Sequence, residues 1–444
     1  MVFKERQITF DNRSHQITNI NVWTPDSQWL VYDVRPNGAS FTGLTIEKIH
    51  VDNGKTEIIY LAENGAHVGV VTVSQQEPVR YAFIHGPEKP DAQWQYDFHH
   101  RRGVIVSDTQ PNVATNIDAM DITPPYTVGA LRGGTHVHVF SPDGSRLSFT
   151  YNDHVMRELD PVLDLRNVAV AVPLRSVISA KKHPREYDGS YFSVVVSQIT
   201  AHPCPGSDDI NRAYEEGWIG QRGYLKDNGQ WQRWALAFVG DTRAENGEKI
   251  PEIYLVDLPE NDRDYEMAGS QSLAGTETTL PAPPAGVKQK RLTFTHDKRW
   301  PGVVNAPRHW LRTSPDGNKI CFLMKDEQGI VQLWYISPNG GEPIQITHSY
   351  QGIQSAFSWD SRSRFIACIC DNSVMLCDSE NGVMRRLTKR TDHAPSADAV
   401  VISPNDRYVA FMRDIDGYRQ IFITETGIDS ADIIGRPTLS GDVQ

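Results

Sequence analysis

The sequence predicts an all-β protein that folds as a single closed β-propeller. The main observation is a phrase that returns along the chain: an aromatic or aliphatic residue, then Ser/Thr-Pro-Asp-Gly or a close variant, then a β-rich run. The phrase begins at Thr24, Ser141, Ser314, Ser358 and Ser403, and its last three starts are 44 and 45 residues apart. That period is typical of one four-stranded propeller blade. Each copy predicts a tight turn, in which Pro sets φ and Asp and Gly complete the turn.

The last three blades are the most regular part of the pattern. Each is expected to contain an inner strand, the Pro-Asp turn, two further strands and an Asx-Gly turn before the outermost strand. The expected strands are 307–313, 319–324, 331–336 and 343–347 in blade 5, 364–370, 373–378 and 384–388 in blade 6, and 408–413 and 420–424 in blade 7. Blade 7 therefore lacks a fourth strand before the polar end of the chain.

The missing strand is predicted at the other end of the sequence. The phrase Arg6-Gln7-Ile8-Thr9-Phe10 matches the outer-strand phrases that begin at Arg291 and Arg386. We therefore expect the N-terminal strand to complete blade 7 and close the ring, because closure removes two exposed sheet edges.

Blades 1 to 4 are less regular. Blade 1 is expected over 15–62. The strands expected in the next three are 66–71, 79–84 and 96–106, then 135–140, 146–151, 168–172 and 191–199, then 218–224, 233–239, 252–257 and 288–294. These give seven blades, with six or eight left open because insertions occur at 157–165, 203–216 and 261–286. The last insertion is rich in Ser, Thr, Gly and Pro and predicts a mobile surface loop. The propeller is expected over 1–428, with a flexible tail at 429–444.

Composition limits the classes of function. The net charge of −11 disfavours nucleic acid and anionic membranes as partners. No apolar run reaches transmembrane length, the start lacks a signal-peptide core, and the five cysteines form no paired framework, so a cytoplasmic protein is expected. Cys368 and Cys370 are interpreted as buried thiols, with a redox or metal pair as the alternative. The sequence contains no Gly-x-Ser-x-Gly elbow, no phosphate loop and no Cys-x-x-Cys pair, so neither a serine peptidase nor a nucleotide site is predicted.

A polar site is predicted at the channel mouth where the inner strands begin. Aligning these strands on their turns places Asn19, His136, His309 and Asp398 at one depth, with His67 and the pair Gln221-Arg222 near them. His138 is expected to face the same way as His136, because side chains two apart share a strand face. Loops of the same face add His85, His154, Arg132 and Arg308.

These residue types suggest two kinds of ligand. His136, His138, His309 and Gln221 could hold a divalent metal such as Mn, Zn, Fe or Ni. Arg132, Arg222 and Arg308 would suit a carboxylate or phosphate. The alternatives are a water-filled polar channel and rim salt bridges. Trp94 and Tyr96 could stack on a sugar or simply pack in a long loop, and the run from His99 to Arg102 is interpreted as strand residues without a function.

The phrase at 24–43 strongly resembles the YidR-like family of enterobacterial proteins, over the whole chain, and the turns are more distantly similar to TolB-type propellers. Thr135-His136-Val137-His138 resembles the Thr-His-Pro-His phrase of oligogalacturonate lyases, and Phe83-Ile84-His85-Gly86-Pro87 is also similar to a stretch there. That resemblance implies seven blades and a manganese ion bound through His-x-His. Gln221 stands where the lyases have His, so His67, His85 or His154 would have to serve as the base.

Two functions are therefore expected from the sequence. The first is a metal-dependent lyase, or a binding protein, for acidic oligosaccharides, with Arg132, Arg222 or Arg308 holding charge. The second is a non-catalytic propeller that binds a protein or small ligand at the same mouth.

Overall fold

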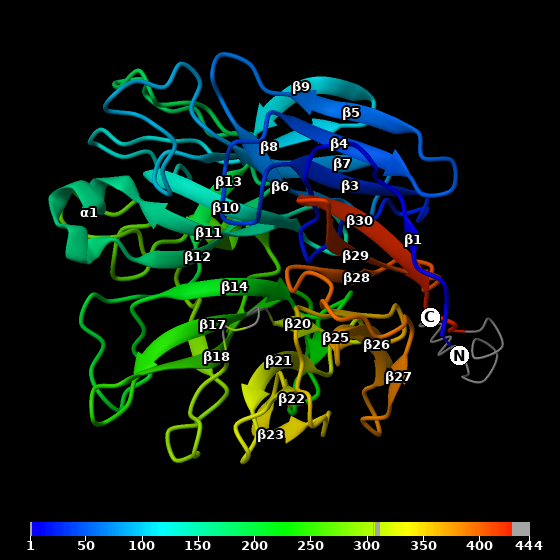
Figure 1. Cartoon of the computed structure of the whole chain (residues 1–444). Helices are drawn as coiled ribbons and strands as arrows, with labels where there is room; N and C mark the ends of the chain where they lie inside the picture. Colours follow the sequence, from blue (N-terminus) through cyan, green and yellow to red (C-terminus); the bar gives the residue numbers. More distant parts are fainter. Residues whose placement is uncertain (1, 305, 307–310, 429–444) are drawn as a thin grey trace, which may run out of the picture.

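The protein is a ring of seven four-stranded antiparallel sheets (Figure 1). The computed structural model describes residues 2–304, 306 and 311–428, and the seven sheets lie within them. The prediction of a seven-bladed propeller is confirmed, and the alternatives of six and eight blades are excluded for this part of the chain. The predicted tail at 429–444 lies outside the described residues.

The strands of the first four blades, from the channel outward, are as follows: β2 (His15–Gln16), β3 (Trp29–Val34), β4 (Thr45–His50) and β5 (Thr56–Leu61); β6 (Val68–Val73), β7 (Arg80–His85), β8 (Arg102–Ser107) and β9 (Gln110–Asn116); β10 (Gly133–Phe140), β11 (Leu147–Asp153), β12 (Arg166–Val172) and β13 (Phe192–Val195); β14 (Ala213–Trp218), β17 (Ala235–Arg243), β18 (Lys249–Asp257) and β19 (Gln289–Arg291). Between β14 and β17 lies a small hairpin of β15 (Tyr224–Leu225) and β16 (Trp231–Gln232). Short helices occupy the insertions: α1 (His154–Leu159), η1 (Pro161–Leu163) and η2 (Asp262–Glu266).

The remaining three blades follow the same order: β20 (Arg312–Thr313), β21 (Ile320–Lys325), β22 (Val331–Ser337) and β23 (Gly340–Gln345); β24 (Ser358–Trp359), β25 (Phe365–Cys370), β26 (Ser373–Asp378) and β27 (Met384–Arg386); β28 (Val400–Ile402), β29 (Tyr408–Ile415) and β30 (Tyr418–Glu425), completed by β1 (Arg6–Gln7).

The repeated phrase forms the turn between the first and second strands, as expected. In blade 5, Ser314 Oγ donates to Asp316 Oδ1 at 2.6 Å and accepts from the Lys319 amide at 3.0 Å. Gly317 has φ +76°, which a residue without Cβ adopts without strain. Side chains of the phrase therefore satisfy polar groups of the turn, which explains why the same residues recur in each copy.

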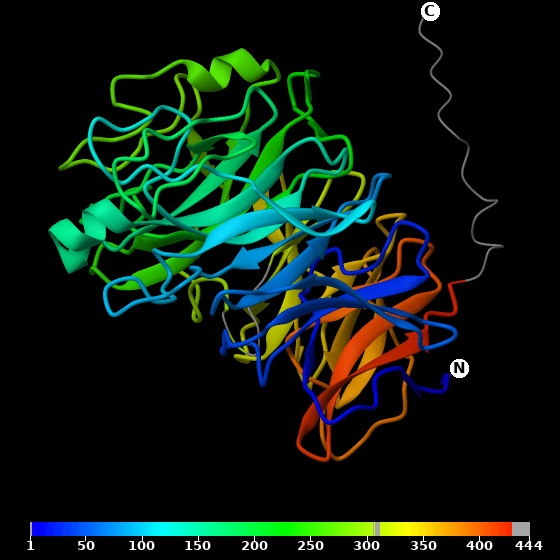
Figure 2. The same cartoon turned by 90° about the horizontal axis from the view of Figure 1, so that it is seen from above.

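The N-terminus closes the ring. β1 pairs with β30 through Arg6↔Ile423 and Gln7↔Phe422, and the Ile8 amide donates to the Ile421 carbonyl at 2.9 Å. In both views the blue N-terminal segment lies beside the red strands of blade 7 (Figures 1 and 2). The predicted closure is confirmed.

The core lies between neighbouring blades. One cluster joins blades 7 and 1 through Trp23, Tyr32 and Met412, and others repeat the arrangement around the ring. Cys368 and Cys370 are buried in the cluster between blades 5 and 6, as predicted for thiols in a strand. No helix in the described ranges is both long and apolar enough to cross a membrane.

Three local predictions were wrong. The inner strand of blade 4 is Ala213–Trp218 and not 218–224, because Gly220 and Gly223 have positive φ and turn the chain into the β15–β16 hairpin. The third strand of blade 2 begins at Arg102, after a long loop. The insertion 261–286 is held against blade 3, since its Thr276 and Thr279 carbonyls accept hydrogen bonds from the buried Arg132.

Candidate functional site

The inner strands of blades 2, 3 and 4 share a β-bulge. Val70, Val137 and Glu215 occupy equivalent places in β6, β10 and β14, and their φ angles are 60°, 55° and 56°. A left-handed backbone is strained for such residues, above all for a β-branched valine. Bulges change which way the following side chains face. They therefore decide what three neighbouring blades present to the channel.

The bulge at Val137 separates the two histidines that were expected to act together. His138 is completely buried, lies 2.9 Å from Thr135 Oγ1 through Nε2, and packs against Gly103 of blade 2. His136 stays partly exposed on the inner strand. The expectation that both rings face the same way is wrong, because the extra residue interrupts the alternation of the strand.

The predicted metal ligands do not come together. His138 lies between blades 2 and 3. Gln221 lies on the opposite face of the ring, where its backbone N–H donates to the Pro315 carbonyl at 2.7 Å. His309 lies outside the described residues. Among the residues that the structure describes, no group of three or more His, Cys, Asp or Glu side chains could hold a metal ion. The described members of the predicted donor set, His136, His138 and Gln221, therefore form no site for manganese or another divalent ion.

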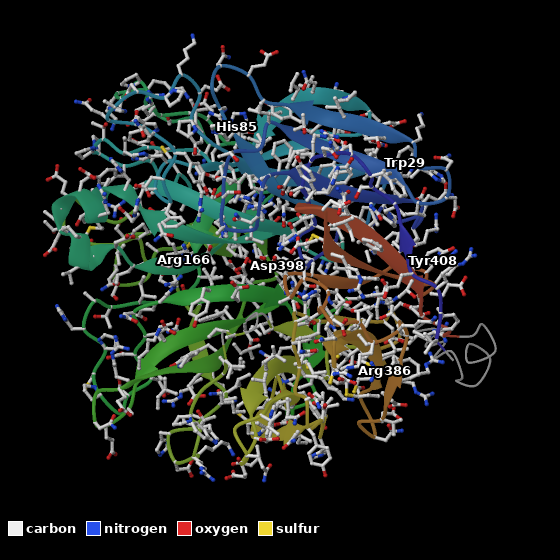
Figure 3. The ribbon with its side chains drawn as sticks, in the orientation of Figure 1. Trp29, His85, Arg166, Arg386, Asp398 and Tyr408 are labelled. Atoms are coloured by element: carbon white, nitrogen blue, oxygen red, sulfur yellow. The ribbon has the colours of Figure 1, made fainter. Side chains whose placement is uncertain are left out.

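The other predicted histidines make contacts within the protein. His85 is 1% exposed, and its two ring nitrogens lie 3.0 Å from Tyr60 Oη and 2.6 Å from the Gly86 carbonyl. It lies away from the centre of the ring, where Asp398 is found (Figure 3). His154 Nδ1 lies 3.3 Å from His100 Nε2, beside Trp94. His67 is half-buried, and its backbone carbonyl accepts from the Gly86 amide at 2.8 Å.

The predicted arginines also separate. Arg132 is fully buried and paired with Asp153 at 2.6 Å, Arg222 is exposed on the same opposite face as Gln221, and Arg308 lies outside the described residues. The cations whose charges act on His136 are instead Arg101, Arg166 and Arg35. We call these four residues the arginine site.

Arg101 is the unusual member of the arginine site. It is 1% exposed and lies just before β8. Its Nη1 donates to Tyr96 Oη at 3.2 Å, but its Nε and Nη2 have no hydrogen-bond partner, and no carboxylate within the described ranges forms an ion pair with it. Burial lowers the pKa of this guanidinium. A buried charge without a partner is costly to a folded protein.

Two further arginines complete the arginine site. Arg166, at the start of β12, donates to Asn152 Oδ1 at 3.1 Å, and burial together with Arg212 and Arg101 lowers its pKa to about 10. Arg35 is paired with Asp33 at 2.5 Å and lies over Gly69, the blade 2 equivalent of His136, where a Cβ would come within 3.4 Å of Arg35 Nε.

The surroundings of His136 keep its ring neutral. Burial, followed by the charges of Arg101, Arg166 and Arg35, holds its pKa well below the usual value. Aromatic rings fix the arginines: Phe98 lies under Arg101 at 4.8 Å and Arg166 at 5.7 Å, and Tyr96 stacks on Phe41 at 4.1 Å. The site thus places positive charge around an uncharged imidazole that can accept a hydrogen bond.

Sequence reasoning missed most of this site. The sequence pattern places Arg101 in a strand without a function and gives no signal for Arg35 or Arg166. The reason is that each arginine comes from a different blade or loop. The one available signal was the adjacency of Tyr96, Phe98 and Arg101 in a long loop that faces the predicted mouth.

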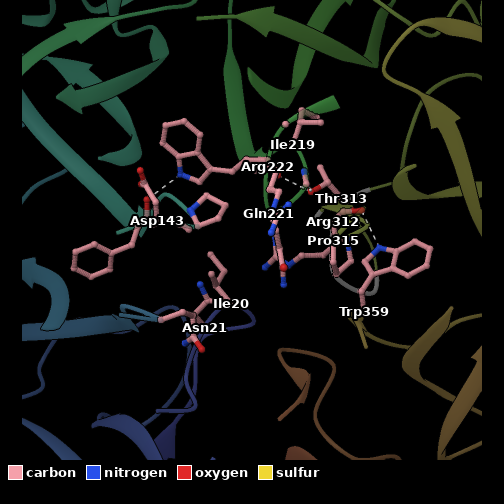
Figure 4. A pocket seen from close by; sticks show the side chains of 18 of the residues that line it. Ile20, Asn21, Asp143, Ile219, Gln221, Arg222, Arg312, Thr313, Pro315 and Trp359 are labelled. Carbon is pink, nitrogen blue, oxygen red and sulfur yellow. Dashed lines mark hydrogen bonds between the residues drawn. The ribbon is translucent and has the colours of Figure 1, made fainter. Parts of the chain in front are cut away.

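The opposite mouth opens into the turn-side cavity, a space of about 1160 Å³ among the Pro-Asp turns. All seven blades contribute to its wall. Figure 4 shows Trp359 and Asp143 on opposite sides, with Gln221, Arg222 and Arg312 between them. Arg312 crosses the channel to donate to the Asn19 carbonyl, and Asn19 Nδ2 donates to Phe357 O at 2.9 Å.

Comparison with known proteins adds a family and a fold. A family model described as "Protein of unknown function (DUF3748)" matches residues 67–187, which include Arg101, His136 and Arg166. The chain is 56% identical to the Escherichia coli (strain K12) protein described as "Uncharacterized protein YidR", over 95% of this chain and 97% of that one.

The similar solved structures are much more distant. An oligogalacturonate lyase in complex with manganese is 11% identical, with a TM-score of 0.55 over 96% of each chain. A putative TolB from Agrobacterium tumefaciens is 13% identical, with a TM-score of 0.39 over 86% of this chain and 97% of that one. At this distance the lyase likeness shows the fold alone.

Proposed function

The chain belongs to the YidR family, and on that premise we propose that its propeller binds an acidic oligosaccharide built on uronic acids, with a sugar carboxylate at the arginine site. The observation that carries the proposal is the unpaired Arg101. Its Nε and Nη2 are buried and unsatisfied, so an anion that reaches them would gain charge-assisted hydrogen bonds and remove the cost of the buried charge.

The neighbours of Arg101 favour a carboxylate on a sugar. Arg166 adds a second guanidinium, and the neutral His136 can accept a hydrogen bond from a hydroxyl group next to the carboxylate. Phe98, Tyr96 and Phe41 hold the arginine in place, so little side-chain entropy is lost on binding. The manganese complex of an oligogalacturonate lyase has the same fold, which makes uronates the first ligands to test.

The same groups define the reaction to test. In β-elimination from a uronate, guanidiniums neutralise the carboxylate and so acidify the proton on the adjacent carbon. A base removes that proton, a C=C bond forms as the C–O bond to the glycosidic oxygen breaks, and the departing oxygen takes up a proton to become a hydroxyl group. His136 is the imidazole beside the arginines, and the negative charge of a bound carboxylate would raise its low pKa toward that of a working base. We propose binding as the function, with elimination measured alongside it.

The test compares trigalacturonate with the neutral trisaccharide maltotriose, by calorimetric titration and thermal shift. Trigalacturonate should bind and raise the melting temperature, because a ligand of the folded state stabilises it, by about 2.7 kcal/mol at a hundred times Kd. Maltotriose should not bind at this site. Unsaturated products, which absorb in the near ultraviolet, would report elimination.

Arg101→Met is the decisive variant. It should abolish the response to trigalacturonate while leaving the unliganded protein as stable as the wild type or more so, because it removes an unpaired buried charge. Arg102→Met is the matched control, since the adjacent Arg102 is partly exposed and paired with Glu88 at 3.0 Å. Unchanged binding in Arg101→Met would overturn the assignment. No binding across a panel of uronates would favour a propeller that binds a protein.

We also propose a cytoplasmic location. All five cysteines are free, four of them are buried, and burial raises the pKa of Cys321, Cys368 and Cys377, which keeps these thiols unreactive. Fractionation of the producing cell, with detection of the untagged protein, tests this location.

A further inference from the structure

The turn-side cavity differs from the arginine site in its charge. Two of the three arginines that line it are engaged within the protein: Arg233 Nη2 lies 3.3 Å from Asp143 Oδ2, and Arg312 donates to the Asn19 carbonyl, whereas Arg222 is exposed. Glu260 adds a carboxylate to the wall. The cavity therefore carries charges of both signs, unlike the arginine site, whose members are an imidazole and three arginines.

The apolar surface of the cavity comes from indole rings. Trp218, Trp231 and Trp359 line it, and each donates its indole N–H to a backbone carbonyl, at 3.2 Å to Val139, 2.7 Å to Arg222 and 3.2 Å to Arg312. Because these polar edges are satisfied by the protein, the rings offer the cavity mainly their carbon surface. Fixed aromatic surfaces of this kind stack against apolar ligand faces at low entropic cost.

Amide groups supply the polar part of the wall. Gln75 and Gln76 each donate through Nε2 to a backbone carbonyl, at 3.0 Å and 3.1 Å, which fixes the side chains and leaves their carbonyl oxygens as acceptors. Asn21 and Gln221 add further amides. A ligand that matches this wall has apolar faces and many hydroxyl groups.

One acidic group in the wall has an oxygen without a hydrogen-bond partner. Glu216 follows the bulge at Glu215 in β14, is 4% exposed, and its Oε1 has no hydrogen-bond partner. Burial raises its pKa to about 8, with a further contribution from the charge of Glu215. At neutral pH this carboxyl group is mostly protonated and can donate a hydrogen bond.

We propose that the turn-side cavity is a second site, independent of the arginine site, which binds an uncharged oligosaccharide by stacking on Trp231 and Trp359 and through a hydrogen bond donated by Glu216. The volume of about 1160 Å³ is sufficient for more than one sugar ring. The two ends of one channel then recognise sugars of different charge.

The test titrates cellopentaose, maltopentaose and xylopentaose into the full-length protein by calorimetry. At least one should bind, and Trp359→Ala should weaken that binding tenfold or more. Trp231→Ala provides a second variant whose ring is 51% exposed, so its loss does not endanger the fold. The Arg101→Met protein should bind the neutral sugar as the wild type does, which separates failure of this proposal from failure of the proposed function.

The role of Glu216 is tested through pH. With a pKa of about 8, about a tenth of the protein carries the protonated carboxyl at pH 9, so the wild type should bind about tenfold more weakly there than at pH 6. Glu216→Gln keeps an uncharged donor and should bind equally at both pH values. If no neutral oligosaccharide binds, or if both tryptophan variants bind normally, the second site is overturned, and the same pH dependence in Glu216→Gln would remove Glu216 from it.

Discussion

Arg132 Nη2 lies 2.6 Å from Asp153 Oδ2, and both side chains are almost completely buried, with 1% and 0% of their surfaces exposed. Arg132 also donates to the carbonyls of Thr276 and Thr279, and Tyr151 Oη donates to the same carboxylate oxygen at 2.8 Å. Arg132 is therefore fixed by its ion pair within blade 3, and its hydrogen bonds attach an insertion of blade 4 to that blade. The contacts of Arg132 give it a structural role at a position where the sequence suggested charge for a ligand.

Replacing Arg132 by Met should lower the free energy of unfolding by about 3–5 kcal/mol, because Asp153 is left buried without its partner. Limited proteolysis should then cut within 261–286. Arg175→Met is the control: its ion pair with Glu266 reaches the same insertion but is exposed, so the loss should be below about 1 kcal/mol. Equal effects of the two variants would contradict this account.

Deleting residues 1–11 should greatly destabilise the protein or make it insoluble. The deletion removes β1, the Ile8–Ile421 hydrogen bond and the pair of Glu5 with Arg413 at 2.8 Å, and it exposes the edge of β30. Calorimetry of the purified protein measures the effect. Deleting 429–444, which lie outside the described residues, should change the melting temperature little, since that segment lacks strand alternation. A soluble 1–11 deletion that melts normally would refute closure by β1.

The two histidines of β10 should behave differently when replaced by Ala. His138→Ala should cost about 2–4 kcal/mol, because it empties a buried site beside Gly103 and leaves Thr135 without its contact, whereas His136→Ala should cost less than about 1 kcal/mol. Urea unfolding gives both values. Manganese should not raise the melting temperature of the wild type through these residues. A manganese-dependent rise that both variants abolish would instead restore the metal site.

Acid should destabilise the protein well above the pH at which carboxylates protonate. Burial lowers the pKa of His85 and His154 to about 4 and that of His138 to about 3. Between about pH 6.5 and pH 4 these three rings bind more protons in the unfolded chain than in the folded one, so their contribution to stability is complete above pH 6.5 and falls as the pH drops through this window. Melting curves at several pH values measure the loss. His85→Gln should reduce its slope, and a flat profile from pH 6.5 to 4.5 would contradict the burial of these rings.

The repeat was enough to predict the architecture. Each turn is satisfied by its own side chains, as Ser314 and Asp316 show, so the phrase specifies a local structure wherever it occurs. Its period then sets the length of a blade, and the outer-strand phrase at Arg6 identifies the strand that closes the ring. These are short-range properties, and the sequence determined them by itself.

The candidate sites were decided only by the tertiary structure. A single extra residue at Val137 turns His138 out of the channel, and the glycines after Trp218 carry Gln221 and Arg222 to the opposite mouth. Arg35, Arg101 and Arg166 come from three blades, and Glu216 faces a cavity that all seven blades build. The sequence fixes no distance between residues on different blades. Ring closure sets those distances, and burial then decides which charges lack a partner.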